Sequence, residues 1–145
     1  MSYWDTSALV KLYVREADSS RFEALASSAT RVVSSTLTRY EARAVFRRKE
    51  ADAALAAGGA DLLYRTLAAD FADSLVEAVA DSPDVEREFG RVLNACLAQS
   101  PPIFVRTLDA LHLASALVAG EREFVTADIR QRAAAQFLGL SVVPV

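Results

Sequence analysis

The sequence contains few of the residues that build disulfide frameworks or thiol metal sites. The chain has one cysteine, Cys96, and one histidine, His112. A lone thiol cannot close an internal disulfide, and it offers none of the paired cysteine spacing of a zinc site. We therefore expect a protein of the reducing cytoplasm, with Cys96 as a core residue.

Long apolar runs and an excess of positive charge are also missing. No run reaches the ~20 residues that a membrane-spanning helix needs. Asp5, Lys11 and Arg15 interrupt the stretch where the apolar part of a signal peptide would lie. With 16 basic and 19 acidic residues, the net charge is −3, which argues against a polybasic membrane or nucleic-acid patch. We predict a cytoplasmic protein without membrane association.

Apolar residues are plentiful in a chain of single-domain length. The 145 residues are 52% hydrophobic, so we expect one domain over 1–145 with a real core. The predicted strands cover 2–5, 31–36, 73–80, 123–128 and 140–145. The predicted helices cover 6–13, 18–27, 37–55, 60–70, the segment from Pro83 to the Pro101–Pro102 pair, 107–120 and 129–138. This alternation predicts an α/β domain, with a mostly parallel central sheet of about five strands flanked by helices.

Two acids occupy equivalent places in this pattern. Asp5 and Asp128 each follow a short apolar strand and precede a helix. Ligands of open parallel sheets bind beyond the carboxyl ends of the strands, so both acids can meet in one crevice. The alternative is that each acid caps its helix. Thr6, Ser7 and Thr126 weaken that alternative because each could cap equally well.

Glu41 is an acid in a helix that should be partly buried. On a 3.6-residue period Leu37, Glu41 and Val45 fall in line, with Ala44 beside them. An unpaired buried charge is costly, so Glu41 should meet a cation, a metal or a wet cleft. The alternatives are that Glu41 pairs with an arginine, or that the buried face of the helix is rotated.

Asp109 lies in the first turn of the most apolar helix, 107–120. The helix dipole favours an acid there, and Thr107 or Asp109 could simply be the cap. A buried helix nevertheless points its first turn into the protein or a crevice. Converging carboxylates repel one another, so a cluster of these acids needs positive charge. Oxygen ligands suit Mg²⁺ or Mn²⁺, and a pair of such ions is the apparatus of phosphoryl displacement.

Four stretches of the chain resemble the PIN domain, and in particular VapC, the ribonuclease toxin of toxin–antitoxin pairs. They are "YWDTSALVKLY", "YEARAVFRR", "VRTLDALHLASAL" and "FVTADIRQRAAAQFLGLSVV". The match runs nearly end to end and is weakest from about 56 to 103. Asp5, Glu41, Asp109 and Asp128 match the first to fourth acids of the family in that order, which implies that they are the catalytic metal ligands.

The resemblance implies a metal-dependent endoribonuclease with a cognate VapB-like antitoxin that blocks the site. It also implies a homodimer, which the apolar residues of the 37–70 helical hairpin support. A housekeeping PIN-domain nuclease that processes RNA is the alternative. Three other function classes do not fit the sequence. A haloacid-dehalogenase phosphatase needs an acid at the position of Ser7, and a receiver module needs a lysine late in the chain, where none follows Lys49. A dinucleotide-binding domain needs a glycine fingerprint that this sequence lacks.

Several residues have a weaker claim on the site. We interpret His112 as a buried imidazole that hydrogen-bonds in the core or to the acids, rather than as a general base. Ser7 is interpreted as a cap, whereas Thr6 and Thr126 are caps or groups that orient the acids.

Basic residues near the motifs could touch RNA phosphates, which an acidic protein needs in order to bind RNA. They are Lys11, Arg15, Arg106 and Arg130. Arg39, Arg43 and Arg47 recur every four residues and are interpreted as a solvated helix face, with RNA contact as the alternative.

Overall fold

The structure, a computed structural model, describes residues 1–144 and has a five-stranded parallel sheet at its centre. The strands are β1 (Ser2–Trp4), β2 (Val32–Ser35), β3 (Val76–Val79), β4 (Glu123–Val125) and β5 (Ser141–Val143). Each predicted strand is present, although each is shorter than predicted. The α/β prediction is confirmed.

The helices also follow the predicted order, with shifted ends. They are α1 (Thr6–Leu9), the 3₁₀ turn η1 (Val10–Leu12), α2 (Ser19–Ser28), α3 (Leu37–Ala51), α4 (Gly59–Ala72), α5 (Pro83–Leu97), α6 (Thr107–Val118) and α7 (Ile129–Phe137). Helix α5 begins as its sequence predicts, because the Ser82 hydroxyl accepts from the Val85 amide and Pro83 takes the first helical position. Within residues 1–144, no helix has the length and hydropathy to span a membrane.

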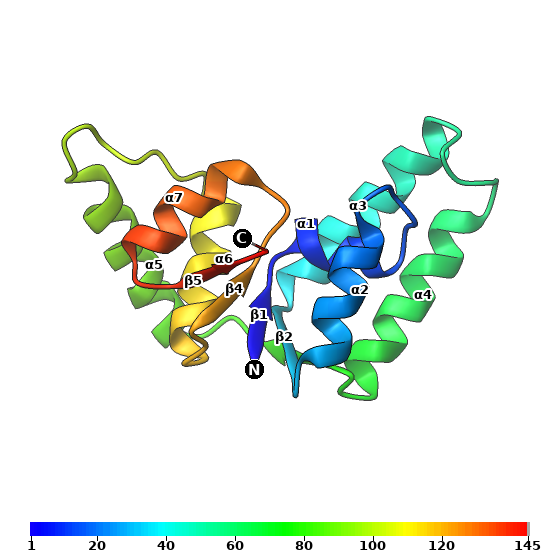
Figure 1. The fold of residues 1–145 in the computed structure, drawn as a ribbon, viewed down its shortest axis with the longest axis horizontal. Helices are drawn as coiled ribbons and strands as arrows, with labels where there is room; N and C mark the ends of the chain where they lie inside the picture. Colours follow the sequence, from blue (N-terminus) through cyan, green and yellow to red (C-terminus); the bar gives the residue numbers. More distant parts are fainter. Residues whose placement is uncertain (145) are drawn as a thin grey trace.

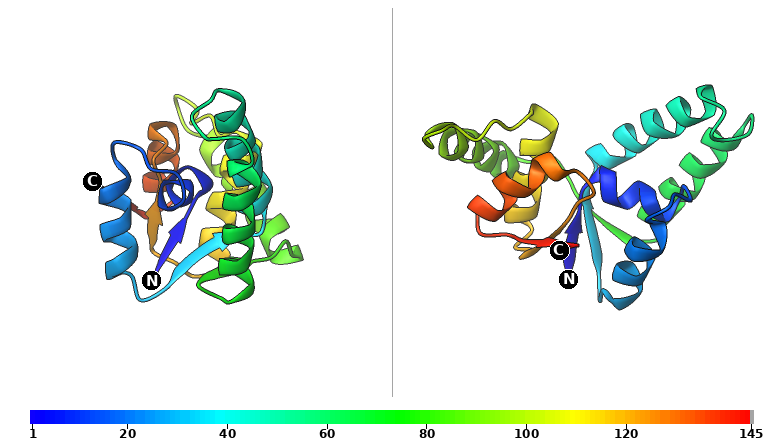
Figure 2. Two further views of the ribbon diagram at one scale, coloured as in Figure 1. Left: turned by 90° about the vertical axis from the view of Figure 1, so that its right-hand side faces the viewer. Right: turned by 45° about the horizontal axis from the view of Figure 1, so that its top comes forward.

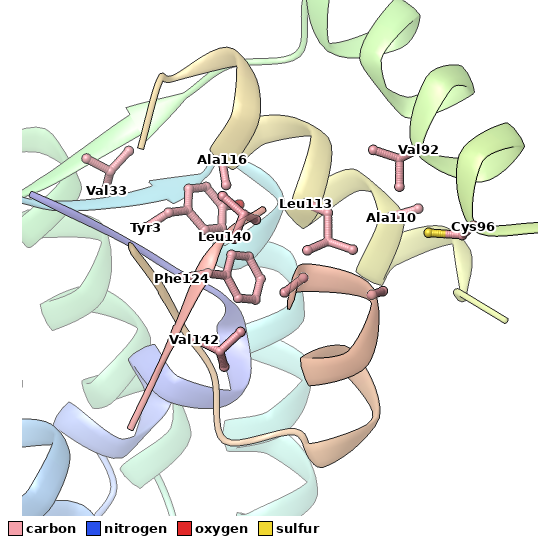
Figure 3. Close-up of a cluster of buried hydrophobic side chains, with 12 residues drawn as sticks. Tyr3, Val33, Val92, Cys96, Ala110, Leu113, Ala116, Phe124, Leu140 and Val142 are labelled. Carbon is pink, nitrogen blue, oxygen red and sulfur yellow. The ribbon is translucent and has the colours of Figure 1, made fainter. Parts of the chain in front are cut away.

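The sheet has a separate core on each face because neighbouring strand residues point in opposite directions. Tyr3 joins a cluster with Leu113 and Phe124 under α5, α6 and α7 (Figure 3). Trp4, the next residue, joins Phe46 in a second cluster under α1 to α4. Figure 1 shows these two helical layers on either side of β1. Cys96 is buried in the first core, as predicted, and burial raises the pKa of its thiol.

Helices α3 and α4 form the predicted hairpin, which projects away from the sheet (Figure 2). The buried face of α3 is Thr38, Ala42 and Phe46. The predicted stripe through Leu37 and Glu41 is therefore wrong, and the rotated alternative holds. The physical reason is that turning Phe46 inward buries a larger apolar side chain than turning in Leu37. Glu41 is left on the flank of the helix.

The strand order β3-β2-β1-β4-β5 creates a switch point at the centre of the sheet. The chain runs outward from β1 through β2 to β3, and then returns to the other side of β1 for β4 and β5. Strands β1 and β4 are also joined at their carboxyl ends, where the amide of Asp5, just after β1, donates to the carbonyl of Val125 at 3.1 Å. Crevices at such points are where open α/β sheets bind ligands.

Candidate active site

A pocket beyond the carboxyl ends of β1 and β4 is lined by all of the acids selected from the sequence: Asp5, Glu41, Asp109 and Asp128. They come from the end of β1, the flank of α3, the first turn of α6 and the start of α7. The predicted convergence of these acids is therefore observed. Thr6, Ser7, Arg106 and His112 also line the pocket.

Asp5 is buried, with 1% of its surface exposed, and both of its carboxylate oxygens are hydrogen-bonded. Oδ1 accepts from the Ser7 hydroxyl at 2.7 Å and the Ala8 amide at 2.9 Å, while Oδ2 accepts from the Thr126 hydroxyl at 2.6 Å. Asp5 thus caps α1 and lines the pocket at once. Burial raises the pKa of the carboxyl in spite of these donors.

Ser7 is not the helix cap that its position predicted. Its hydroxyl donates to Asp5 and accepts from the Ala127 amide at 2.9 Å, so it ties α1 to the segment after β4. The Thr126 hydroxyl donates to Asp5 and accepts from the Asp128 amide at 3.0 Å. The two hydroxyls hold Asp5 from two chain segments, and this arrangement depends on tertiary contacts that local sequence does not encode.

Glu41 is part-buried and its Oε1 atom contacts two side chains. The Thr6 hydroxyl donates to Oε1 at 2.9 Å, and Nε2 of His112 lies 2.6 Å from the same oxygen. Burial alone would raise the pKa of Glu41, but the hydrogen bond from His112, with Thr6 and Arg106, outweighs it and the pKa is lowered. The interpretation of His112 as a buried imidazole bonded to the acids is confirmed.

Asp109 and Asp128 are held by exposed cations. Arg106 donates from Nε to Asp109 at 2.7 Å and from Nη2 to Asp128 at 3.1 Å. Arg130 also binds Asp128, through its amide and its guanidinium, and lowers the pKa of that carboxyl. Asp128 caps α7 with its side chain. Asp109 does not cap α6, because the N-cap position of α6 is Arg106, whose side chain makes no capping hydrogen bond.

Two further polar residues, which the sequence interpretation missed, line the pocket. Arg48 lines the pocket two helical turns after Glu41, a spacing that places both on one face of α3. Gln131 is 4% exposed and donates from Nε2 to Asp109 at 2.8 Å. Its Oε1 atom is buried and has no hydrogen-bond partner among residues 1–144.

The other predicted basic contacts differ in their surroundings. Lys11 is paired with Glu16 and Asp18, outside the acid pocket, whereas Arg15 is exposed. The solvated-face interpretation of the α3 arginines holds for Arg43 and Arg47, which are exposed, whereas Arg39 is half-buried. The guanidinium of Arg43 also lies 4.4 Å from the ring centroid of Tyr64, and that of Arg39 lies 5.9 Å from the ring centroid of Phe71. Arg47 pairs with Glu50 on α3 itself.

The predicted pair of shared metal positions is not formed among the described residues, since no group of three or more Asp, Glu, His or Cys side chains has metal-holding geometry. The reason is that the carboxylates bind side chains of the protein instead, and Arg106 bridges Asp109 and Asp128. The donor chemistry nevertheless fits a hard divalent cation, because carboxylates line the pocket and the unpartnered Oε1 of Gln131 adds a neutral oxygen. The arginines that pair with Asp109 and Asp128 are exposed, so a cation could replace them without unpacking the core.

Comparisons with known proteins agree on the fold. No curated protein matches the chain. The crystal structure of VapC20 from Mycobacterium tuberculosis, described as a sarcin–ricin loop cleaving toxin, is 18% identical, with a TM-score of 0.67 and coverage of 92% of this chain and 95% of that one. VapBC-1 from nontypeable Haemophilus influenzae is 15% identical, with a TM-score of 0.68 and coverage of 98% of this chain and 96% of that one. FitAcB from Neisseria gonorrhoeae is 18% identical, with a TM-score of 0.66 and coverage of 98% of this chain and 96% of that one. The PIN domain model matches residues 2–136, and the chain therefore belongs to the PIN-domain family.

Proposed function

We propose that this protein is a metal-dependent endoribonuclease that hydrolyses RNA phosphodiester bonds, and that it is the toxin of a VapBC-type toxin–antitoxin pair. The observation that carries the proposal is the pocket itself, in which Asp5, Glu41, Asp109 and Asp128 line one space at the switch point of a PIN-domain sheet. A structural set of helix caps would not need all four acids on one cavity.

The four carboxylates would hold Mg²⁺ or Mn²⁺, and Gln131, whose Nε2 donates to Asp109, lines the same pocket and could supply its amide oxygen. When bound, such ions activate water and neutralise the charge that develops on the phosphate. The protein's own part is to keep Asp5 and Glu41 fixed through buried hydrogen bonds. It also keeps the negative charges close together, which makes the pocket attractive to cations.

RNA must approach a protein whose net charge is −3. Arg48 and Arg106 line the acid pocket, and Arg130 lies beside it, so local positive charge surrounds the acids. We assign these three arginines to phosphate contacts, with Arg15 further out. The Lys11 amine is a weaker candidate because its two acidic partners already neutralise it.

The similar structures support an antitoxin partner, because they include toxin–antitoxin complexes such as one from Klebsiella pneumoniae. Arg106 bridges Asp109 and Asp128, which supports inhibition of the site by an arginine of the antitoxin. A guanidinium from the antitoxin would bind the same carboxylates as a charge-assisted pair and exclude both metal and RNA.

A homodimer is supported by apolar residues exposed on the α3–α4 hairpin and just after it. Tyr40, Leu62 and Leu75 are 71%, 59% and 67% exposed. A second copy covering them would remove apolar surface from water. Light scattering at micromolar concentration should give the mass of two chains, and a monomer would contradict this part of the proposal.

The test is controlled expression in a bacterium, with RNA ends mapped, beside an Asp5→Asn control. The wild type should arrest growth and produce new RNA 5′ ends, while the variant should do neither. Co-expression of a short gene directly upstream should relieve the arrest. Cleavage without rescue would favour the housekeeping nuclease, and no cleavage in Mg²⁺ or Mn²⁺ would overturn the enzyme proposal.

A further inference from the structure

A buried chain of polar groups runs from strand β2 to the acid pocket. The Ser35 amide donates to the Tyr3 hydroxyl at 3.1 Å, and that hydroxyl lies 2.7 Å from Nδ1 of His112. Nε2 of His112 lies 2.6 Å from Oε1 of Glu41. Tyr3 and His112 are 0% and 1% exposed, so this chain connects the protein interior with one carboxylate of the pocket.

The hydrogens along this chain can be assigned consistently in one direction. The Tyr3 oxygen accepts from the Ser35 amide and donates its own hydrogen to Nδ1 of His112. In this assignment Nδ1 carries no hydrogen, and Nε2 carries one that it donates to Glu41.

This polar chain is not what an apolar core requires. Tyr3 stacks on Phe124 with ring centroids 5.6 Å apart and sits among aliphatic side chains (Figure 3). A phenylalanine would fill the same apolar space, but it would leave the Ser35 amide and Nδ1 of His112 without this partner. Buried polar groups are costly unless every member is bonded, so the arrangement is best explained by what it does to Glu41 at its open end.

The contacts of Glu41 are concentrated on one oxygen. Thr6 and His112 both bind Oε1, and among residues 1–144 no hydrogen bond reaches Oε2. The side chain is 25% exposed and lines the pocket. Fixing one oxygen by two groups of the interior leaves the other oxygen free for a ligand in the pocket.

We propose that Tyr3 and His112 are positioning residues that hold Oε1 of Glu41, so that Oε2 is presented to a divalent cation. His112 acts through Glu41 and takes no direct part in the chemistry. Partners that orient a ligating side chain typically contribute about 10- to 100-fold in metal affinity. The identity of the ligand rests on the proposed function, but the hydrogen-bonded chain can be tested without it.

The first measurement is the ¹⁵N NMR spectrum of the imidazole in EDTA at neutral pH. The chain contains one histidine, so every imidazole signal belongs to His112. We expect a single tautomer with its hydrogen on Nε2, and a loss of that preference in Tyr3→Phe. A hydrogen on Nδ1, or on both nitrogens, would overturn the assignment.

The second measurement is Mn²⁺ binding by calorimetry, with unfolding curves to show that each variant is folded. Tyr3→Phe and His112→Leu should weaken binding, the latter about tenfold or more, and His112→Gln should retain more affinity because its amide can donate to Glu41. Tyr13→Phe is the matched control: Tyr13 donates its hydroxyl to Asp70 at 2.6 Å, outside the pocket. This control should bind Mn²⁺ as the wild type does.

The decisive comparison adds Glu41→Gln. If Tyr3 and His112 act through Glu41, Tyr3→Phe should weaken Mn²⁺ binding no further in the Glu41→Gln background. The proposal would be overturned if Tyr3→Phe lowered Mn²⁺ affinity equally in both backgrounds, or if the Tyr3→Phe protein bound Mn²⁺ like the wild type. A wild type that binds no Mn²⁺ would also overturn it. A wild type that binds Mn²⁺ through this chain but does not cleave RNA would overturn the proposed function alone.

Discussion

The two halves of the acid pocket are held in different ways. Asp5 and Glu41 are bound by hydroxyls, a backbone amide and an imidazole, all from the protein interior. Asp109 and Asp128 are bound mainly by Arg106 and Arg130, whose side chains are 59% and 71% exposed. The first half is fixed by packing, whereas the second is held by cations that can exchange.

This difference explains the opposite pKa shifts of Asp5 and Asp128. Burial raises the pKa of Asp5, while the hydrogen bond and charge of Arg130 lower that of Asp128. A cation that enters the pocket would replace exposed arginines at Asp109 and Asp128 without disturbing the hydroxyls around Asp5. We infer that the buried half defines the position of the site and that the exposed half controls entry to it.

The largest expected effect is on RNA cleavage. Asp5→Asn and Asp109→Asn should each lower the rate by at least about 100-fold, because stabilising the developing charge is usually the largest catalytic contribution. The measurement is cleavage of a labelled RNA in Mg²⁺ or Mn²⁺. The control is Asp61→Asn, an exposed acid of α4 outside the pocket, which should cleave normally. Equal rates for Asp5→Asn and the wild type would remove Asp5 from the site.

A core substitution should give the reverse pattern. Leu67→Ala, at a fully buried position of α4 in the second core, should lower the free energy of unfolding by about 2–5 kcal/mol. Molecules that remain folded should still cleave RNA. Leu97→Ala on α5 is the control, since Leu97 is 48% exposed and lies outside the proposed dimer surface, and its change should stay within about 0.5 kcal/mol. A large loss of cleavage by folded Leu67→Ala would mean that the pocket is not independent of this core.

The pH dependence of stability should have opposite signs for Asp5 and Asp128. Because the folded pKa of Asp5 is raised, its stabilising contribution exists below its ordinary pKa and is lost as the pH rises through the raised value. Asp5→Asn in EDTA should therefore equal or exceed the wild type in stability at neutral pH, with the gap closing in acid. The lowered pKa of Asp128 predicts that Asp128→Asn is the less stable protein at neutral pH, and that this loss disappears as the pH falls. Thermal unfolding from neutral to acidic pH measures both, and shifts of the same sign would contradict the comparison.

The smallest expected effect concerns the exposed half. Arg106→Gln should change the free energy of unfolding by less than about 1 kcal/mol, because exposed ion pairs contribute little. Its Mn²⁺ affinity should rise, since a competing cation has been removed from Asp109 and Asp128. Arg87→Gln, at an exposed pair on α5, serves as the control and should leave Mn²⁺ binding unchanged. Weaker Mn²⁺ binding by Arg106→Gln would show that Arg106 supports the site rather than competes for it.

The contrast between halves also explains what could be predicted from the sequence. Asp5 and Asp128 follow short strands, and the geometry of parallel sheets then brings strand ends together. The buried face of α3 was predicted wrongly because Leu37 and Val45 gave as regular a stripe as Ala42 and Phe46, and only packing against the sheet decides between them. The contacts of His112 join segments more than 70 residues apart, so no local pattern could reveal them.

The most direct test of the cation site is a Mn²⁺ titration of the wild type and Asp5→Asn, each first shown to be folded in EDTA. Asp5 is the most deeply buried acid of the pocket, and its amide analogue keeps the shape of the side chain while removing the charge. We predict that the wild type binds Mn²⁺ and that Asp5→Asn binds it at least about tenfold more weakly. Equal affinity in the two proteins, or no binding by the wild type at millimolar Mn²⁺, would contradict the account.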